Sequence, residues 1–502
     1  MKNKLQQLIS WQESVQNRPE FLFVEKIFSQ FSSADVYLVG GAVRDLLLDR
    51  ATKDYDFVVR GVLADDLEKF LSNFGSVDLV GKSFGVFKFV PDGFRVGEND
   101  FEAIDIALPR TESAGMSGGY TDFAIQSDHL LPIEEDLSRR DFTINALAWS
   151  WREQKLIDEF GGLDDLENKI IKAIGDPEIR FQEDYTRMLR AIRLSCQLSF
   201  EIEPKTYKVI KEKSKQIKSI AIERINDEFI KIIMSDRASN GIRMMKDLGL
   251  LDELIPELAS AFGVEQNRHH IYDVFEHSVR ALEAGAQRNF KLEVRLGALF
   301  HDIGKPTTKD GQGENSTFYN HDLVGAKMTK KILKRLGFSN EIIDYTVHLV
   351  RYHMFYYALD IVSDSGVRRL LSRIGKENID DFINLRICDR LGMGRPKAKP
   401  WKLIELERRF KEVQLDPITP KMIALKGDEL MKLLGISPGP RVGMILNAML
   451  GEVLDDPQKN KQDYLIERAK ELQQLSDLEL KALNPDVKFY EEERKRELHQ
   501  EK

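Results

Sequence analysis

Residues 36–59, VYLVGGAVRDLLLDRATKDYDFVV, decide the fold of the N-terminal part of the chain. A β-type run, VYLV, leads into Gly40-Gly41, and the apolar periodicity of AVRDLLL predicts a helix directly after the glycines. A second β-type run, YDFVV, follows. The glycines let the backbone approach a phosphate closely, and the helix N-terminus adds N–H donors. Arg44 lies one turn into this helix, so Gly40, Gly41 and Arg44 are candidate nucleotide contacts.

Two carboxylates lie on the second β-type run. Because alternate residues of a strand share a face, Asp54 and Asp56 point to the same side. Such a pair can hold two Mg²⁺ ions about 3.5–4 Å apart, which clamp the attacking and leaving oxygens of an in-line displacement. Asp105, in the apolar frame Ile104-Asp105-Ile106, is the candidate third carboxylate. A glycine pair alone is a turn and an Asp-x-Asp pair alone is a solvated strand edge, but in this order they indicate a catalytic Mg²⁺ site.

The rest of the chain divides by composition. Further β-type runs (FGVFKFV, AIDIAL) alternate with helical pieces, which predicts an α/β head over residues 1–150. From about residue 151 the sequence is typical of helices almost to its end. We expect a helical neck over 151–250, a histidine-rich domain over 251–393 and a helical tail over 394–502, with GRPKAKP (394–400) as a linker.

The composition limits the class of protein. The 502 residues are 42% hydrophobic and 31% charged, and no apolar run reaches the length of a membrane span. The N-terminus lacks the apolar core of a signal peptide, and two distant cysteines exclude a disulfide framework, so we expect a cytoplasmic protein. The net charge of −8 argues against a protein that is basic all over. Contacts to a polyanion are therefore expected at local basic strips, in residues 205–218 and 386–411.

A second motif, EEDLSRRDFTINALA (134–148), contains the adjacent Arg139 and Arg140, whose planar guanidinium groups suit triphosphate oxygens. Asp141 and Asn145 of the same motif are further candidate nucleotide-binding residues.

Asp176-Pro177 predicts the start of a long helix that contains EDYTRMLRAIRLSCQL, on which Asp184 and Arg187 share a face. A carboxylate beside a guanidinium can read cytosine or adenine, because it accepts from the exocyclic amine while the guanidinium donates to the ring nitrogen. The alternative is an ordinary surface ion pair. Arg190 and Arg193 continue the same stripe.

An ordered set of motifs over about residues 35–250 resembles the class II tRNA nucleotidyltransferases, the CCA-adding enzymes and their bacterial poly(A) polymerase relatives. The motifs are LVGGAVRDLLL, KDYDFVV, ALPRTE with a glycine-rich loop, EEDLSRRDFTINALA, LIDEFGGLDDLENKIIKAIGDPEIRFQEDYTRMLRAIR and AIERINDEF. The resemblance implies a polymerase-β-type head that transfers nucleotides from CTP and ATP to tRNA, with no DNA and no membrane as partner. It also implies that the helical tail over 394–502 binds tRNA. It assigns Mg²⁺ to Asp54 and Asp56, nucleotide contacts to Gly41, Arg44, Arg140, Arg190 and Arg193, and base selection to Asp184 and Arg187.

The chain departs from the family pattern at Tyr185-Thr186, where proline and leucine are usual, and at Glu159, where proline is usual. The glycine-rich segment 110–121 matches the loop that the family uses while switching from C to A. The stretch after the metal strands, DLVGKSFGVFKFV, is close to the CCA-adding type, whereas the poly(A) polymerases carry a basic stretch there. We therefore expect CCA addition. A poly(A) polymerase and a specialist that adds only A or only CC are the alternatives.

Seven of the nine histidines lie between residues 269 and 353. His277, His301-Asp302 and Asp389 form the pattern H…HD…D, whose ligands suit Mg²⁺ or a divalent transition metal. Residues 269–392 resemble an HD-type phosphohydrolase domain, which implies hydrolysis of phosphomonoesters or 2′,3′-cyclic phosphates by a metal-bound water.

His321 and one more histidine could bind a second metal or a phosphate. His348 and His353 lie about 140° apart on a helix, so both are not expected to face one site. The resemblance to HD domains, which place a histidine at this point, favours His353. His269 and His270 are left open. The alternatives are an inactive helical scaffold that binds RNA, and a phosphohydrolase whose α/β part only binds a regulatory nucleotide.

Overall fold

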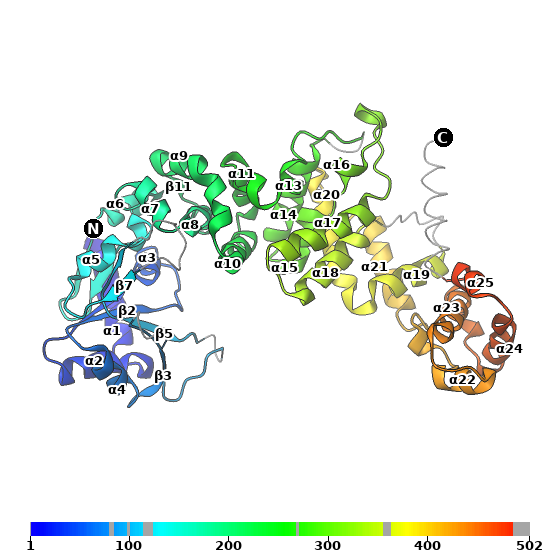
Figure 1. Cartoon of the computed structure of the whole chain (residues 1–502), viewed down its shortest axis with the longest axis horizontal. Coiled ribbons are helices and arrows are strands. Elements are labelled where there is room, and N and C mark those ends of the chain that lie inside the picture. The colour runs from blue at the N-terminus through cyan, green and yellow to red at the C-terminus, as the bar shows by residue number, and fades with distance from the viewer. Residues whose placement is uncertain are drawn as a thin grey trace. The chain divides into compact units, whose positions relative to one another are not determined.

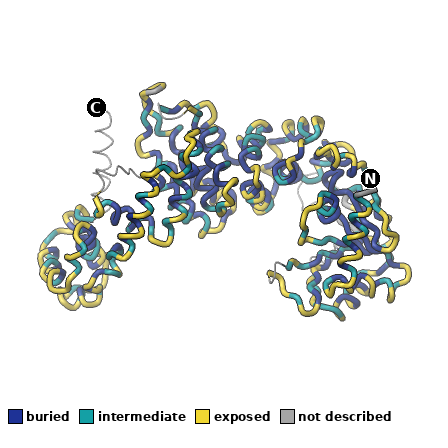
Figure 2. The backbone as a smooth tube through the Cα atoms, turned by 180° about the vertical axis from the view of Figure 1, so that it is seen from behind, coloured by how far each residue is buried: buried dark blue, intermediate teal, exposed yellow. Residues whose placement is uncertain are grey.

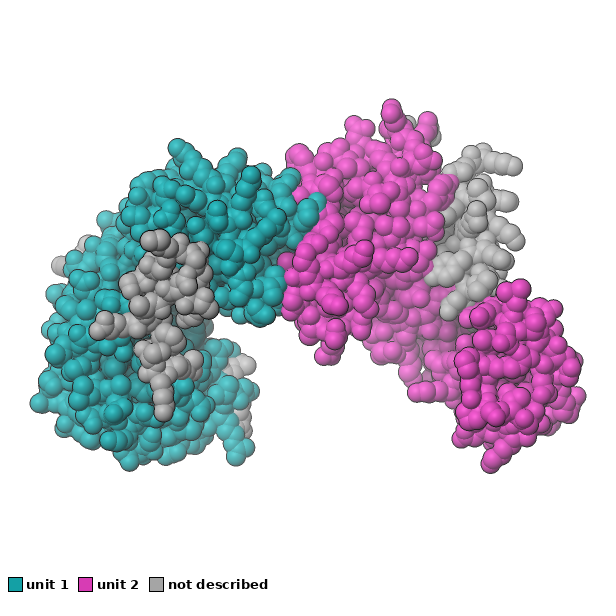
Figure 3. Space-filling model, viewed as in Figure 1, with its two compact units in different colours: residues 1–256 teal, residues 257–502 magenta. Residues whose placement is uncertain are grey.

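The computed structural model describes residues 2–79, 85–97, 101–113, 124–267, 271–354 and 363–484. The chain forms two compact units, Met1–Pro256 and Glu257–Lys502 (Figure 3). His269, His270 and the predicted switching loop from residue 114 onward lie outside the described residues. Over the parts that are described, no helix is both long enough and apolar enough to cross a bilayer.

A seven-stranded mixed sheet forms the head, in the order β3-β4-β5-β2-β1-β8-β9 (Figure 1). Strands β2 and β5 run parallel and the other neighbours are antiparallel. The sheet confirms the predicted α/β head. Its strand β9 lies beyond residue 150, where the head was expected to end. The strand bounds are β1 (Asp35–Val39), β2 (Asp56–Arg60), β3 (Gly75–Leu79), β4 (Val86–Pro91), β5 (Ile104–Ala107), β8 (Ala148–Ser150) and β9 (Lys155–Ile157).

Two smaller sheets accompany the main one. They pair β6 (Arg110–Ser113) with β7 (Ala124–Ser127), and β10 (Ile170–Ile171) with β11 (Glu201–Ile202).

An aromatic cluster forms part of the core of the first unit. Aromatic side chains from the sheet and from the N-terminal segment are fully buried together, among them Phe21, Phe57 and Trp151. The helix bounds are α1 (Lys2–Val15), α2 (Leu22–Gln30), α3 (Gly41–Leu47), α4 (Ala64–Leu71), α5 (Ile133–Ser138), α6 (Gly162–Asn168), α7 (Pro177–Glu183), α8 (Thr186–Leu198), α9 (Pro204–Lys213), α10 (Ile222–Ile233), α11 (Ala238–Asp247) and α12 (Leu250–Leu254).

The long helix predicted after Asp176 is wrong in one respect. Asp176 caps α7 by accepting from the Glu178 N–H, with Pro177 in the first turn, as expected. The helix then breaks at Asp184, whose backbone is extended (φ −156°, ψ 103°). Asp184 instead accepts from the Thr186 N–H (3.0 Å) at the start of α8. Short aspartate side chains compete for backbone donors in this way, and a break results.

Helices joined by turns and loops, with one isolated β-bridge between Asp310 and Thr317, make up the described residues of the second unit. Buried and exposed positions alternate along these helices (Figure 2). Helices α14 and α20 pack against each other, as do α17 and α18. The bounds are α13 (Pro256–Ala259, across the division), α14 (Val274–Ala286), α15 (Leu292–Phe300), α16 (Lys305–Thr308), α17 (His321–Arg335), α18 (Asn340–Arg351), α19 (Asp364–Ile374), α20 (Ile379–Gly392), α21 (Trp401–Val413), α22 (Gly427–Leu434), α23 (Pro440–Asp455), α24 (Gln462–Gln473) and α25 (Asp477–Ala482).

Candidate active sites

Gly40 ends strand β1 in a conformation that favours glycine, with φ at +71°. A Cβ at this position would lie 2.6 Å from Arg140 Nη1 and 3.7 Å from Asp56 Oδ2. A Cβ at Gly41 would lie 3.5 Å from Arg44 Nη2. Because Gly40 has no side chain, its backbone lies directly beside a guanidinium and a carboxylate. A nucleoside triphosphate with its bound cation needs this combination of groups.

The carboxylates of the head lie on neighbouring strands. Asp56 of β2 is the register partner of Asp105 of β5, and Lys88 of β4 faces Asp105 from the other side with its Nζ 3.2 Å from the carboxylate. Asp54 lies just before β2. Burial and the charge of Asp105 raise the pKa of Asp54.

The pKa of Asp56 rises to about 6, because burial and the nearby Asp54 outweigh the Arg140 guanidinium. Carboxylates that repel each other in a buried site are a donor set that fits Mg²⁺. Among the described residues, two sets of ligands have all their ligand atoms within 4.8 Å of one another, and both lie in the second unit. The carboxylates of Asp54, Asp56 and Asp105 are spaced more widely than this.

Asp136 is a buried residue of the head that the sequence analysis missed. Its Oδ1 accepts from Arg139 Nε (3.0 Å) and Nη2 (2.8 Å) and from the Arg110 N–H (3.2 Å). Its Oδ2 accepts from Arg140 Nη2 (3.4 Å). One fully buried carboxylate thus orients both predicted phosphate-binding arginines. The sequence carried one sign of this contact, because Asp136 lies three and four residues before the two arginines, a spacing that brings side chains together on a helix.

A chain of polar contacts joins the glycine turn to helix α8. Arg44 Nη1 donates to Asn145 Oδ1 (2.6 Å), and Asn145 Nδ2 donates to Asp141 Oδ1 (3.0 Å). Arg190 Nε donates to Asp141 Oδ2 (2.7 Å). Burial alone would raise the pKa of Asp141, but the Arg190 charge and the Asn145 hydrogen bond hold it well below its usual range. Four predicted nucleotide-binding residues therefore form one network.

The predicted base-reading pair is not formed in the expected way. Asp184 accepts two hydrogen bonds from Arg224 of α10, at 3.1 and 2.6 Å. Arg187 is buried, and its Nη1 donates to Glu183 (2.6 Å) while its Nη2 donates to the Arg139 carbonyl (2.9 Å). Asp184 and Arg187 thus each pair with another residue, and the helix expected to carry both is interrupted at Asp184.

Arg193 Nε donates to Glu228 of α10 (2.6 Å). Arg224 and Glu228 lie in AIERINDEF. The sequence identifies this motif but does not predict that its residues pair with Asp184 and Arg193.

The second unit brings together imidazoles and carboxylates from five segments. His277 (α14), His301 (end of α15) and Asp389 (α20) place their ligand atoms within 4.8 Å of one another, and all three are buried. His277 Nε2 lies 2.9 Å from His301 Nε2 and 3.3 Å from Asp389 Oδ1. Asp302 Oδ2 lies 3.2 Å from His277 Nε2.

A second set of ligands contains Asp302, whose carboxylate also lies next to His277 of the first set. Asp302, His321 (start of α17) and His353 (after α18) also lie within 4.8 Å of one another and are buried. Asp302 Oδ1 is 3.5 Å from His321 Nε2 and 3.7 Å from His353 Nε2. Within the described ranges, the Nε2 atoms of His321 and His353 have no hydrogen-bond partner. Buried ring nitrogens of this kind fit a metal ion.

Backbone carbonyls orient three of the rings. The Nδ1 atoms of His301, His321 and His353 donate to the carbonyls of Ala298 (2.8 Å), Phe318 (2.7 Å) and Val350 (2.7 Å). Because a carbonyl only accepts, each Nδ1 carries the proton and each Nε2 is left as a ligand.

The charges of the cluster oppose one another. Burial alone would lower the pKa of His301, but Asp302 and Asp389 raise it to about 10. Burial and the neighbouring cations lower the pKa of His321 to about 4, despite Asp302. Imidazoles that share carboxylates in one buried site can exchange protons for a metal.

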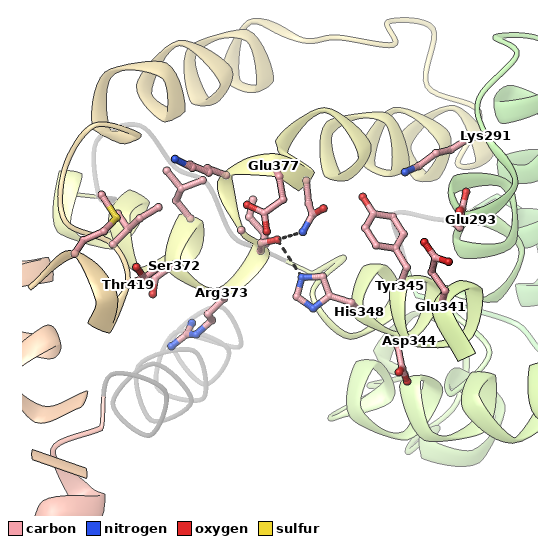
Figure 4. Close-up of a pocket in the computed structure, with 17 residues that line it drawn as sticks. Lys291, Glu293, Glu341, Asp344, Tyr345, His348, Ser372, Arg373, Glu377 and Thr419 are labelled. Carbon is pink, nitrogen blue, oxygen red and sulfur yellow. Dashed lines mark hydrogen bonds between the residues drawn. The ribbon is translucent and has the colours of Figure 1, made fainter. Parts of the chain in front are cut away.

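His348 lies apart from this cluster. It lines a cavity of about 930 Å³ together with Tyr345 and Arg373 (Figure 4). His348 Nε2 donates to the Ile374 carbonyl (3.1 Å), and the ring packs edge-on against Phe382.

Comparison with protein families gives three matches. The Poly A polymerase head domain matches residues 36–172, the probable RNA and SrmB-binding site of polymerase A matches 199–262, and the HD domain matches 274–389. Nucleotidyltransferase and HD domains use divalent metals, in agreement with the carboxylate and histidine sites.

Several curated relatives align over most of the chain. An A-adding tRNA nucleotidyltransferase of Deinococcus radiodurans is 35% identical over 83% of this chain and 92% of its own. A CC-adding tRNA nucleotidyltransferase of Thermus thermophilus is 30% identical over 84% of this chain and 90% of its own. A multifunctional CCA protein of Neisseria meningitidis is 31% identical over 73% of this chain and 84% of its own.

The CCA-adding enzyme of Bacillus stearothermophilus, solved in complex with CTP, shares the fold with a TM-score of 0.64 at 23% identity, over 91% of this chain and 99% of its own. The chain belongs to the family of tRNA nucleotidyltransferases, with a poly(A) polymerase head domain and an HD domain.

Proposed function

We propose that this enzyme adds C, C and A to the 3′ end of tRNA, using CTP and ATP and releasing pyrophosphate. The observation that carries the proposal is the meeting of the Gly40 backbone, the Arg140 guanidinium and the Asp56 carboxylate at one point of the head sheet. Relatives named for A addition, CC addition and CCA processing support the same activity.

In the proposed reaction the 3′-hydroxyl oxygen of the RNA attacks the α-phosphate of the nucleotide. A new P–O bond forms, the bond to the β-phosphate oxygen breaks, and pyrophosphate leaves with its electron pair. Asp54 and Asp56 would hold Mg²⁺, with Asp105 beside them, and bound Mg²⁺ supplies charge neutralisation at the phosphates. Arg140 and Arg139, oriented by Asp136, bind phosphate oxygens.

Base selection is proposed to rest on Asp184 and Arg187, and Arg190 and Arg193 of α8 are proposed to contact the nucleotide. Asp184 is held by Arg224 on both oxygens, so the carboxylate is pre-oriented by a residue of α10. A carboxylate in this position accepts from the exocyclic amine of C or A, whereas U and G present an oxygen there.

A specialist that adds only A is the second candidate. It is favoured by the 35% identity to the A-adding enzyme of Deinococcus radiodurans. Nucleotide supply separates the two candidates, because the specialist would extend tRNA ending in CC and ignore CTP.

The HD domain is proposed to hydrolyse phosphomonoesters or 2′,3′-cyclic phosphates at damaged RNA ends. His277, His301, Asp302 and Asp389 would hold one divalent metal, and Asp302, His321 and His353 would hold a second. Bound metal supplies an activated water. The metals proposed are divalent transition metals or Mg²⁺, since imidazole suits the former and carboxylate either. Such hydrolysis would free the hydroxyl that the head needs.

The cytoplasm is proposed as the site of action, since Cys196 and Cys388 are buried free thiols. tRNA is the proposed nucleic acid, with no DNA or membrane as partner. Lys205, Lys213 and Lys218 in the first basic strip pair with acidic residues at 3.3, 2.7 and 2.6 Å, which leaves the strip less positive than its sequence indicates.

Two variants test the two sites. Asp54→Ala is expected to abolish nucleotide addition to a tRNA lacking CCA while phosphatase activity on a nucleoside monophosphate persists. Asp302→Ala is expected to do the reverse. Loss of both activities in either variant, with unchanged circular dichroism, would contradict two independent sites. Addition that persists in Asp54→Ala would contradict the proposed Mg²⁺ site.

A further inference from the structure

We infer that helix α1 positions the metal-binding carboxylates of the head, through Trp11 stacked on Tyr55, the residue between Asp54 and Asp56. This inference rests on the proposed function of the head. Helix α1 ends at Val15, before the part of the chain that matches the polymerase head domain, which begins at residue 36.

Helix α1 is an integral part of the head. Its Leu8 is fully buried, and it packs against α3, the helix that follows the glycine turn. Gln12 is 3% exposed and uses both ends of its amide, accepting from Trp149 Nε1 (2.7 Å) and donating to the Trp151 carbonyl (2.9 Å). The amide therefore fixes the helix to the edge of β8.

Trp11 reaches the metal segment directly. Its ring stacks on Tyr55 with centroids 5.9 Å apart and an interplanar angle of 24°. Phe21 packs edge-on against both rings, 6.1 Å from Trp11 and 5.0 Å from Tyr55. Tyr55 is thus held by the face of one ring and the edge of another.

The backbone around Asp54 has little regular support. Residues 51–55 precede β2 and belong to no strand or helix. The Tyr55 carbonyl accepts from the Asp105 N–H (3.1 Å), which is the contact to β5. Because Tyr55 lies between the two carboxylates in the chain, its ring, held by Trp11 and Phe21, anchors the backbone that carries Asp54 and Asp56. Loss of that anchor would let both carboxylates move apart or turn.

The test measures how much Mg²⁺ the head needs to bind ATP. Equilibrium dialysis of the full-length protein with labelled ATP, in the absence of RNA, gives the half-saturating Mg²⁺ concentration without any transfer. Trp11→Ala is expected to raise this concentration about tenfold, as supporting residues of metal sites typically do. Trp11→Phe keeps an aromatic face and is expected to restore most of the wild-type value.

Leu8→Ala is the matched control, because it removes a fully buried side chain of the same helix and leaves the rings on Tyr55 in place. It is expected to lower the melting temperature without raising the Mg²⁺ requirement. Equal Mg²⁺ requirements for Trp11→Ala and Leu8→Ala would overturn the inference. Wild-type protein that binds ATP with Mg²⁺ but extends no tRNA would contradict the proposed function alone, and the variants would still decide the role of Trp11.

Discussion

Substitution of Gly40 by alanine separates backbone strain from active-site geometry. Gly40 has φ +71° and ψ −133°, and an alanine there costs about 1–3 kcal/mol because L-residues avoid this region. For a unit of this size that cost lowers the melting temperature by about 2–12 °C. The new Cβ would also lie 2.6 Å from Arg140 Nη1. The guanidinium sits at the end of a flexible side chain, so it moves aside and adds little to the loss of stability.

The displacement of the guanidinium should instead lower the catalytic rate. Relief of the contact requires a shift of about 1 Å, and a misplacement of that size can cost about 100-fold in rate. Steady-state kinetics with ATP and a tRNA ending in CC measure kcat/KM, and differential scanning calorimetry measures stability. Gly161→Ala is the control, since Gly161 has φ +73° and nothing lies within 4 Å of a Cβ there.

Gly161 lies in the left-handed region that Lys169 and Ser199 also adopt, so its substitution should cost less stability than that of Gly40. Only Gly40→Ala should also lose rate. If Gly40→Ala keeps its kcat/KM within about threefold of Gly161→Ala, a difference below about 0.7 kcal/mol in transition-state stabilisation, the assignment of Arg140 to the nucleotide site is refuted.

Three other substitutions have defined outcomes. Asp141→Asn leaves a guanidinium without its counter-charge and should lower the free energy of unfolding in urea by about 2–3 kcal/mol; a change under about 0.5 kcal/mol would contradict the network. Asp302→Asn should weaken metal binding about 10-fold or more by elemental analysis after dialysis, whereas two retained equivalents would exclude a shared ligand. Arg224→Met should lower the preference for CTP and ATP over UTP and GTP about tenfold, because Asp184 loses its orientation, and exposed Glu223→Ala should leave the preference unchanged.

Local signals predicted the elements that carry the head site. The first strand, glycine turn and helix of residues 36–47 form as expected, because hydrophobic alternation, paired glycines and an apolar stripe all favour the same structures. The second strand begins only at Asp56, so Asp54 and Tyr55 precede it instead of lying on it. Asp176-Pro177 likewise marks the start of α7. The short strand β9 was not predicted, since three residues carry too little periodicity to stand out from a turn.

Contacts between distant residues account for what the sequence did not predict. Helix periodicity placed Asp184 and Arg187 on one face, but Asp184 pairs with Arg224, which is 40 residues away along the chain. A spacing rule describes neighbours on one helix and cannot anticipate a partner from another. The same holds for the division of the ligands into two sets that share Asp302, which depends on how α14, α15, α17, α18 and α20 pack.

Sequencing of tRNA 3′ ends tests the central claim most directly. A tRNA lacking CCA is incubated with the enzyme and Mg²⁺ in three reactions, with CTP alone, ATP alone and both. We predict ends extended by CC with CTP alone and by CCA with both nucleotides. Ends extended only when the substrate already carries CC would show an A-adding specialist, and long A tails with ATP alone would show a poly(A) polymerase; either result would contradict CCA addition by this enzyme.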